Sequence, residues 1–143
     1  MAIDQTAWDA IQNHLGYTEE EMNCFKENPM NEEILSKAPA LMNKTIIAEV
    51  VESHGCNSQH KQGDRFYFDG AGNLITKKNP KRICVYALSS FAHLVFASNE
   101  LVYAGVDPNE IRLKRTGCFD VGVKCGGWGK IVLELKVEDR KKT

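Results

Sequence analysis

The segment 131–138 is the feature that most constrains the fold. Apolar side chains stand at every second position from Ile131 to Val137, and mostly charged side chains stand between them. A period of two is that of a β-strand with one face buried and the other in water. Such a strand needs partners, and a sheet with one wet face is typical of antiparallel pairing. The sequence therefore predicts an antiparallel sheet that is covered on one face.

Shorter stretches supply the other predicted strands. Residues 45–52 and 65–69 are rich in β-branched and aromatic side chains. Turn residues at 69–73 predict a hairpin that returns through 74–76, and 111–115 is expected to form a brief strand. The next segment shows helical spacing instead, so it predicts one core helix over 84–97. The apolar face of that helix comprises Cys84, Ala87, Leu88, Phe91, Leu94 and Val95.

Residues 1–42 have a different pattern and predict a helical N-terminal extension. A first helix is expected to be capped by Thr6 and closed by Gly16. The run Thr18–Glu21 is a capping box that opens a second helix. A short third helix is expected to end before Pro39, because proline disfavours the helical conformation of the residue before it.

Residues 43–143 are then expected to form the cysteine-containing core domain. The predicted fold class is α+β, because a run of strands shares one core with a single helix rather than alternating with several. In this prediction a small antiparallel sheet with one core helix follows the helical N-terminal extension.

Composition excludes several classes of protein. The chain has 143 residues, of which 43% are hydrophobic and 26% charged, and these values exclude a disordered chain. A net charge of -1 gives no footprint for nucleic acid, and the basic runs at 77–82 and 140–142 are interpreted as solvated surface. No apolar run is long enough to span a bilayer, and the N-terminus lacks a signal-peptide pattern. The predicted location is the cytoplasm, with no nucleic-acid or membrane partner.

The chain has five cysteines, an odd number that does not fit a complete disulfide framework. In a reducing compartment, clustered cysteines indicate metal binding first, and redox or nucleophilic chemistry second. The candidate ligands come from the polar loop 54–64, the start of the core helix and the glycine-rich segment 117–129. They are Cys56, Cys84, Cys118 and Cys125, with His60 as an alternate. Cys24 is interpreted as a packing residue.

These ligands predict an iron–sulfur cluster, with zinc as the second choice, since both need about four thiolate or imidazole ligands. The sequence has no Cys-x-x-Cys pair, so the spacing does not identify the metal. The protein would be an accessory or electron-transfer subunit of a larger anaerobic enzyme. Its expected partner is another protein or a second copy of itself.

Three alternatives remain open. A small enzyme would use Cys84 as nucleophile or redox thiolate at a helix N-terminus, with His60 or Asp120 as base. A non-catalytic interaction module would dock residues 1–42 on a partner or on a second copy. Finally, free cysteines are often buried and often only fill space, so the cysteines could be inert.

The cysteine pattern resembles an uncharacterised family of small prokaryotic domains that is common in anaerobes and archaea. That pattern runs Cys, Gly-x-x-Phe, Cys-Pro-x-Ala, Cys-x-Asp and a final strand. The matching residues are Cys56, Gly63–Phe66, Cys84–Ala87, Cys118–Asp120 and 131–137. Val85 stands where the family has proline, and Cys125 is extra. The resemblance covers roughly residues 44–138; it implies a sheet-and-helix domain with three cysteines in one site, and it implies no activity.

Overall fold

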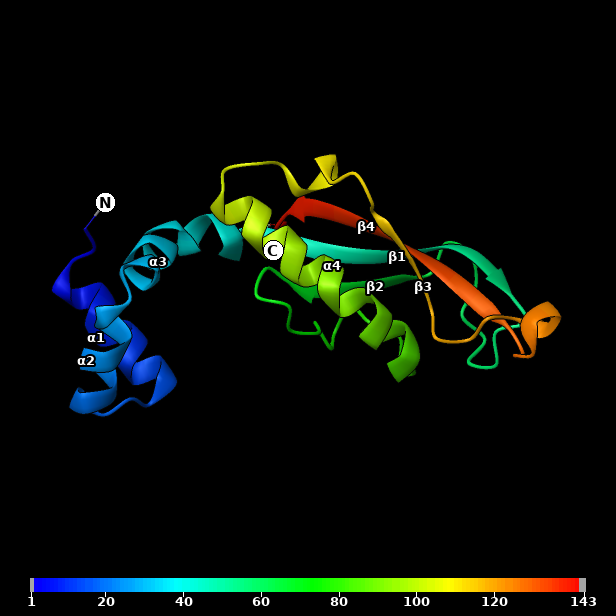
Figure 1. The fold of residues 1–143 in the computed structure, drawn as a ribbon, viewed down its shortest axis with the longest axis horizontal. Helices are drawn as coiled ribbons and strands as arrows, with labels where there is room; N and C mark the ends of the chain where they lie inside the picture. Colours follow the sequence, from blue (N-terminus) through cyan, green and yellow to red (C-terminus); the bar gives the residue numbers. More distant parts are fainter. Residues whose placement is uncertain (1, 142–143) are drawn as a thin grey trace. The chain divides into compact units, whose positions relative to one another are not determined.

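The computed structural model describes residues 2–141. The chain forms two compact units, Met1–Ala40 and Leu41–Thr143. Three helices begin in the smaller unit, and the larger unit contains one long helix and a four-stranded antiparallel sheet (Figure 1). The predicted α+β class is confirmed.

Helix α1 spans Gln5–Leu15. Asp4 caps it in place of Thr6, because the Asp4 carboxylate accepts a hydrogen bond from the Ala7 N–H at 2.9 Å. Gly16 closes the helix as predicted, in the left-handed conformation with φ 71°. The predicted starting residue was therefore wrong, although both residues are good caps and lie only two positions apart.

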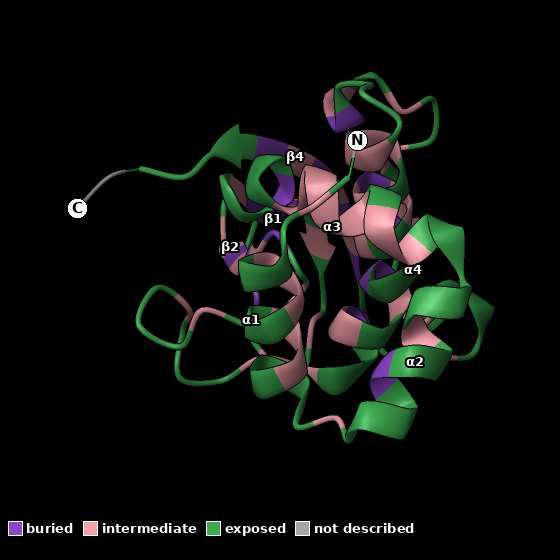
Figure 2. Cartoon of the chain, turned by 90° about the vertical axis from the view of Figure 1, so that its left-hand side faces the viewer, coloured by how far each residue is buried: buried purple, intermediate pink, exposed green. Residues whose placement is uncertain are grey.

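Helix α2 spans Glu19–Glu27 and opens with the predicted capping box at Thr18–Glu21. Its buried residue is Met22, whereas α1 has none, and both helices are largely exposed (Figure 2). Phe25 packs in an edge-on arrangement against Trp8, with ring centroids 6.4 Å apart. The smaller unit thus has only a small aromatic cluster rather than a broad core.

Helix α3 spans Pro29–Met42, so the prediction that it ends before Pro39 was wrong. Proline inside a helix removes one backbone N–H donor, but it does not forbid the helix from continuing. Asn28 starts the helix by accepting from the N–H of Met30 at 3.0 Å. At the other end Leu41 is buried, and its burial favours the extra turn beyond the proline.

The sheet has the order β2-β1-β4-β3, and every neighbouring pair is antiparallel. β1 is its centre: Ile46 lies opposite Phe68 on one side and Val137 on the other. The predicted strand at 131–138 therefore pairs directly with the other central strand. The strands are β1 (Lys44–His54), β2 (Arg65–Asp69), β3 (Arg115–Gly117) and β4 (Lys130–Asp139).

Helix α4, Val85–Tyr103, lies across one face of the sheet (Figure 1). The predicted apolar face is confirmed, since Ala87, Phe91 and Leu94 are buried against the strands. Phe91 stacks on Phe68 with ring centroids 5.7 Å apart. Among residues 2–141, no helix combines the length and the apolar character needed to cross a bilayer.

The opposite face of the sheet carries charged side chains. Glu49 accepts hydrogen bonds from Arg65 at 2.9 Å and pairs with Lys136 at 2.7 Å. Arg115 pairs with Glu134 at 2.8 Å. Such partly exposed ion pairs contribute only about 0–1 kcal/mol each to the free energy of folding, so they add little to the stability of the sheet.

Asparagine side chains replace predicted strands at both edges of the sheet. The predicted hairpin return through 74–76 forms only in part: one antiparallel bridge joins Phe68 to Leu74, and the Ile75 N–H donates to the Tyr67 carbonyl at 3.0 Å, but no further strand follows. Instead, the Asn79 side chain accepts from the Tyr67 N–H and donates to the Tyr67 carbonyl, both at 2.7 Å. The amide side chain of Asn79 thus makes the two hydrogen bonds that the backbone of a neighbouring strand residue would make.

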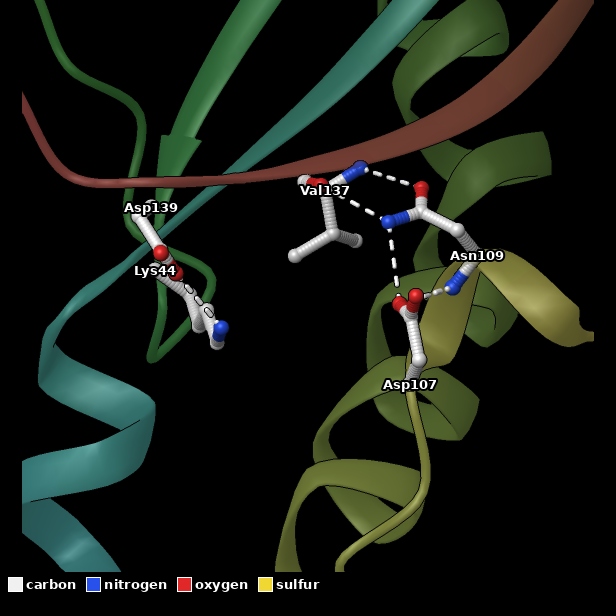
Figure 3. Close-up of polar contacts among 5 residues, drawn as sticks. All are labelled: Lys44, Asp107, Asn109, Val137 and Asp139. Carbon is white, nitrogen blue, oxygen red and sulfur yellow. Dashed lines mark hydrogen bonds and ion pairs between the residues drawn. The ribbon is translucent and has the colours of Figure 1, made fainter.

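At the other edge, the Asn109 side chain pairs with the backbone of Val137 in the same way, at 2.8 and 2.9 Å (Figure 3). Asp107 holds Asn109 in turn by accepting from its backbone N–H at 2.9 Å. The strand predicted at 111–115 begins only at Arg115, because Asn109 already occupies the β4 backbone farther along.

Candidate cysteine site

Three segments that are distant in sequence meet at one cavity of about 210 Å³ at the end of the sheet where β1 ends and β4 begins. Each segment brings one cysteine to it. We call it the cysteine cavity. Its lining consists of Cys56, Asn57, Ser58, His60, Cys84, Tyr86, Ala87, Cys118, Asp120, Trp128, Gly129 and Ile131.

Cys84 is the N-cap residue of α4, immediately before the first helical turn. Its thiol makes no capping hydrogen bond of ordinary geometry, so its interaction with the helix is electrostatic. Burial raises the pKa of this thiol, but the N–H groups of Ala87 and Tyr86 and the Ser58 side chain together outweigh burial. The pKa of Cys84 therefore lies below its ordinary value.

Cys118 continues the pairing of β3 with β4, because its N–H donates to the carbonyl of Ile131 at 3.1 Å. The Cys118 sulfur in turn accepts from the Ile131 N–H at 3.3 Å. The same thiol points its S–H toward the Asp120 carbonyl at 3.7 Å. A backbone donor is thus already in place for a thiolate at this position.

The Asp120 carboxylate is bonded to the backbone of its own loop. One oxygen accepts from the N–H groups of Gly122 at 2.9 Å and Trp128 at 3.0 Å, and the other accepts from Gly129 at 3.0 Å. The N–H groups of Gly129 and Gly122, followed by that of Trp128, lower the pKa of Asp120 despite some desolvation. This geometry is that of a loop anchor, and it leaves the carboxylate poorly placed to take up a proton.

Gly129 brings the glycine-rich segment against the loop that carries Cys56. A side chain at Gly129 would place its Cβ 1.9 Å from the Gly55 carbonyl oxygen and 2.7 Å from the Cys56 nitrogen. The Cys56 carbonyl accepts from the N–H of Gln59 at 3.0 Å, in a turn where Gln59 has φ 62°. Only glycine permits this close approach, which brings the Cys56 and Cys118 segments together.

His60 is only 5% exposed and lies at the wall of the cysteine cavity. Its Nε2 accepts from the N–H of Cys84 at 3.2 Å, and its ring packs edge-on against Phe66 at 4.9 Å. Burial lowers the pKa of His60, and the charge of Arg82 lowers it further, while Asp64 acts in the opposite direction. His60 is therefore a neutral acceptor that holds the start of α4, and its Nε2 lone pair is in use.

The other two cysteines lie elsewhere. Cys125 belongs to a short 3₁₀ helix at Val123–Cys125, is exposed and does not line the cysteine cavity. Cys24 is also exposed, so its interpretation as a packing residue was wrong. Its neighbour Met22 takes the buried position on α2 instead.

The part of the chain that the structure describes has no group of side chains placed to bind a single metal ion. No three His, Cys, Asp or Glu side chains within residues 2–141 are grouped closely enough to hold one metal ion. The three cysteines surround a shared space without converging on one point.

Three exposed aromatic side chains, which we call the rim, lie at or beside the cysteine cavity, and the sequence pattern did not single out Tyr86 or Phe119. Tyr86 stacks on Phe119 with ring centroids 5.6 Å apart, and both are exposed. Trp128 lines the cavity and is 75% exposed. Their closeness in sequence to the candidate cysteines could have indicated them, because Tyr86 follows Cys84 by two residues and Phe119 follows Cys118 directly.

Comparison with known proteins gives no relative: no protein-family model, curated protein or solved structure matches this chain significantly.

Proposed function

We propose that this protein binds an iron–sulfur cluster through Cys56, Cys84 and Cys118 and serves as an accessory or electron-transfer subunit. One observation carries the proposal. Three cysteines from three separate segments line a single cavity, while the remaining two lie on the exterior. Cysteine thiolates are the usual protein ligands of such clusters.

Hydrogen-bond donors around the sulfur atoms support this reading. The Ile131 N–H already donates to Cys118, and the first-turn N–H groups of α4 favour the thiolate of Cys84. Hydrogen bonds to the sulfurs are one of the factors that stabilise and tune a cluster.

Zinc is the second choice for the same cavity. A tetrahedral zinc ion with Zn–S bonds of about 2.3 Å holds its sulfur ligands roughly 3.8 Å apart, whereas a cluster of several irons and sulfides holds its thiolates farther apart. Within residues 2–141 no three such ligands are grouped for a single ion, so either metal centre would need the side chains around the cavity of about 210 Å³ to move.

Three protein thiolates would leave one position of a cluster open. His60 could fill it only by giving up the N–H of Cys84, and Cys125 only by a rearrangement of its loop. A fourth ligand would therefore come from one of these two residues after such a change, or from outside the chain.

The accessory role rests on the exposed apolar rim. Tyr86 and Trp128 line the cysteine cavity and Phe119 stacks on Tyr86, and large exposed apolar side chains of this kind are what a partner protein covers. A partner seated there would bring its own redox centre close to the cluster.

The test is purification without oxygen, followed by iron and sulfide analysis and a visible spectrum. We expect both elements in the wild-type protein, together with visible absorption. Single serine variants at Cys56, Cys84 and Cys118 should each lose most of the iron. Serine variants at Cys24 and Cys125 are the matched controls and should retain it. A folded, colourless wild-type protein that stays metal-free after reconstitution would refute the proposal.

A second candidate function rests on the lowered pKa of Cys84. A thiolate at the wall of a cavity could act as a nucleophile or redox group, as in cysteine-dependent enzymes. In metal-free protein, Cys84 should then react with iodoacetamide faster than Cys24 or Cys125 near neutral pH. Equal, ordinary rates at all five cysteines would remove this candidate.

A further inference from the structure

The two basic runs of the sequence meet at the opposite end of the sheet. Lys77 and Lys78 follow β2, and Arg140 and Lys141 follow β4, yet all four line one cavity of about 380 Å³. We call it the basic cavity. It lies where β1 begins and β4 ends, roughly 30 Å along the central strands from the cysteine cavity.

Positive charge at the basic cavity is only partly compensated. Lys44 also lines it and pairs with Asp139 at 2.6 Å (Figure 3). Asp69 lines it too, but its carboxylate accepts from the N–H groups of Ala71 at 3.0 Å and Asn73 at 2.9 Å. The four cations of the two basic runs form no ion pair within the described residues 2–141.

The loop that carries two of these cations is held in place. Asn79 pairs with the backbone of Tyr67 and also donates to the Ile75 carbonyl at 3.0 Å. The Lys78 N–H donates to the same Ile75 carbonyl at 3.0 Å, and its ammonium group lies 5.7 Å from the centre of the Tyr67 ring. Because the loop is ordered before binding, less entropy is lost when a ligand arrives.

We propose that the basic cavity binds a small anion that carries phosphate groups. Several ammonium and guanidinium donors around one concavity suit phosphate, which accepts many hydrogen bonds and carries more than one charge. The hydroxyl-bearing Thr45 also lines the cavity. A long nucleic acid fits less well, because the whole chain has a net charge of -1.

Calorimetric titration of the full-length protein with inorganic pyrophosphate at low salt tests the proposal. We expect saturable binding that weakens as salt rises. The double variant Lys77→Ala/Lys78→Ala should lose about tenfold in affinity or more. The control variant Lys124→Ala/Lys130→Ala removes the same charge at the other end of the sheet and should bind as the wild type does.

Three results would overturn the proposal: no saturable binding in the millimolar range, an equal loss in the control variant, or tighter binding of a single-stranded oligonucleotide than of pyrophosphate. The last result would assign the surface to a polymer. None of them depends on whether the cysteines hold a cluster, so the two proposals stand or fall separately.

Discussion

Asp120 has a side chain that could act as a base, but in this structure the carboxylate holds a loop in place. Its two carboxylate oxygens accept three backbone N–H groups, two of which belong to Trp128 and Gly129, eight and nine residues away. The sequence marked Asp120 as a candidate base because it follows Cys118 by two positions. The local sequence does not indicate that the chain returns to it, so its role as a loop anchor could not be read in advance.

Replacing Asp120 should therefore disturb the site without removing a ligand. Asp120→Ala loses both carboxylate oxygens and leaves three backbone N–H donors without their acceptor, and we expect about 10–100-fold weaker cluster retention, as for other residues that orient metal ligands. Asp120→Asn keeps one acceptor oxygen and should fall between alanine and wild type. Iron content and the visible spectrum after dilution measure this. Equal retention in all three proteins would contradict the anchoring role.

His60 makes stability depend on pH. Its pKa is lowered in the folded protein, mainly by burial, so the folded state favours the neutral ring. The unfolded chain takes up a proton near the ordinary value of about 6.5. The stabilising effect is thus complete above that value and is lost as the pH falls through the lowered folded-state pKa.

We expect the thermal midpoint of the metal-free protein to fall between about pH 7.5 and pH 5.5. His60→Gln, which keeps an acceptor but does not titrate, should show a flatter dependence. His14→Gln changes a residue on the exposed side of α1 and should keep the wild-type slope. Identical slopes in all three proteins would exclude His60 as the source.

At the scale of elements, the α4 helix and the central strands account for the fold. Their periodic apolar patterns predicted both the core helix and the strand at 131–138, because burial of a regular face is a signal that local sequence carries. Pro39 wrongly indicated the end of a helix, and Asn79 gave no indication in the sequence that it would bond to a strand. The first is a helix breaker inside a helix, and the second imitates a strand through its side chain, which only the tertiary arrangement reveals.

Two phenylalanines on α4 provide a matched test of this packing. Phe91 is 1% exposed and Phe96 is 67% exposed. Phe91→Ala should lower the free energy of unfolding by about 3–5 kcal/mol. Phe96→Ala should change it by less than about 0.5 kcal/mol. Denaturant unfolding measures both, and similar losses would mean that α4 packs through a different face.

The contact between the two loops at the cysteine cavity has its own test. Gly129→Ala introduces a clash with the Gly55 carbonyl, so we expect a loss of about 1–3 kcal/mol and weaker cluster retention. Gly117→Ala is the control, because a Cβ at that position meets no atom within 4 Å. If both variants behave as the wild type does, the loops are not in this contact.

At the scale of the whole molecule, the larger unit holds both proposed sites. Every residue of the main hydrophobic cluster lies between Ile46 and Val137, as do the cysteines that pack against it. The resemblance and the placement of the soft ligands pointed to Cys56, Cys84 and Cys118 from sequence. The basic cavity was not foreseen, because its two cationic runs lie more than half the core domain apart in the chain.

We therefore expect a fragment of residues 41–143 to fold without the N-terminal helices. It should melt in one cooperative transition and give a well-dispersed NMR spectrum, because it contains the complete core cluster. An unfolded fragment would instead give the N-terminal helices a structural role in the core.

The central claim is that three thiolates hold one iron–sulfur cluster, and X-ray absorption at the iron edge of anaerobically purified protein tests it most directly. The proposal predicts iron surrounded mainly by sulfur, with other iron atoms at short distance, and fewer sulfur neighbours or no bound iron in Cys118→Ser. A shell of oxygen and nitrogen without neighbouring iron would contradict it.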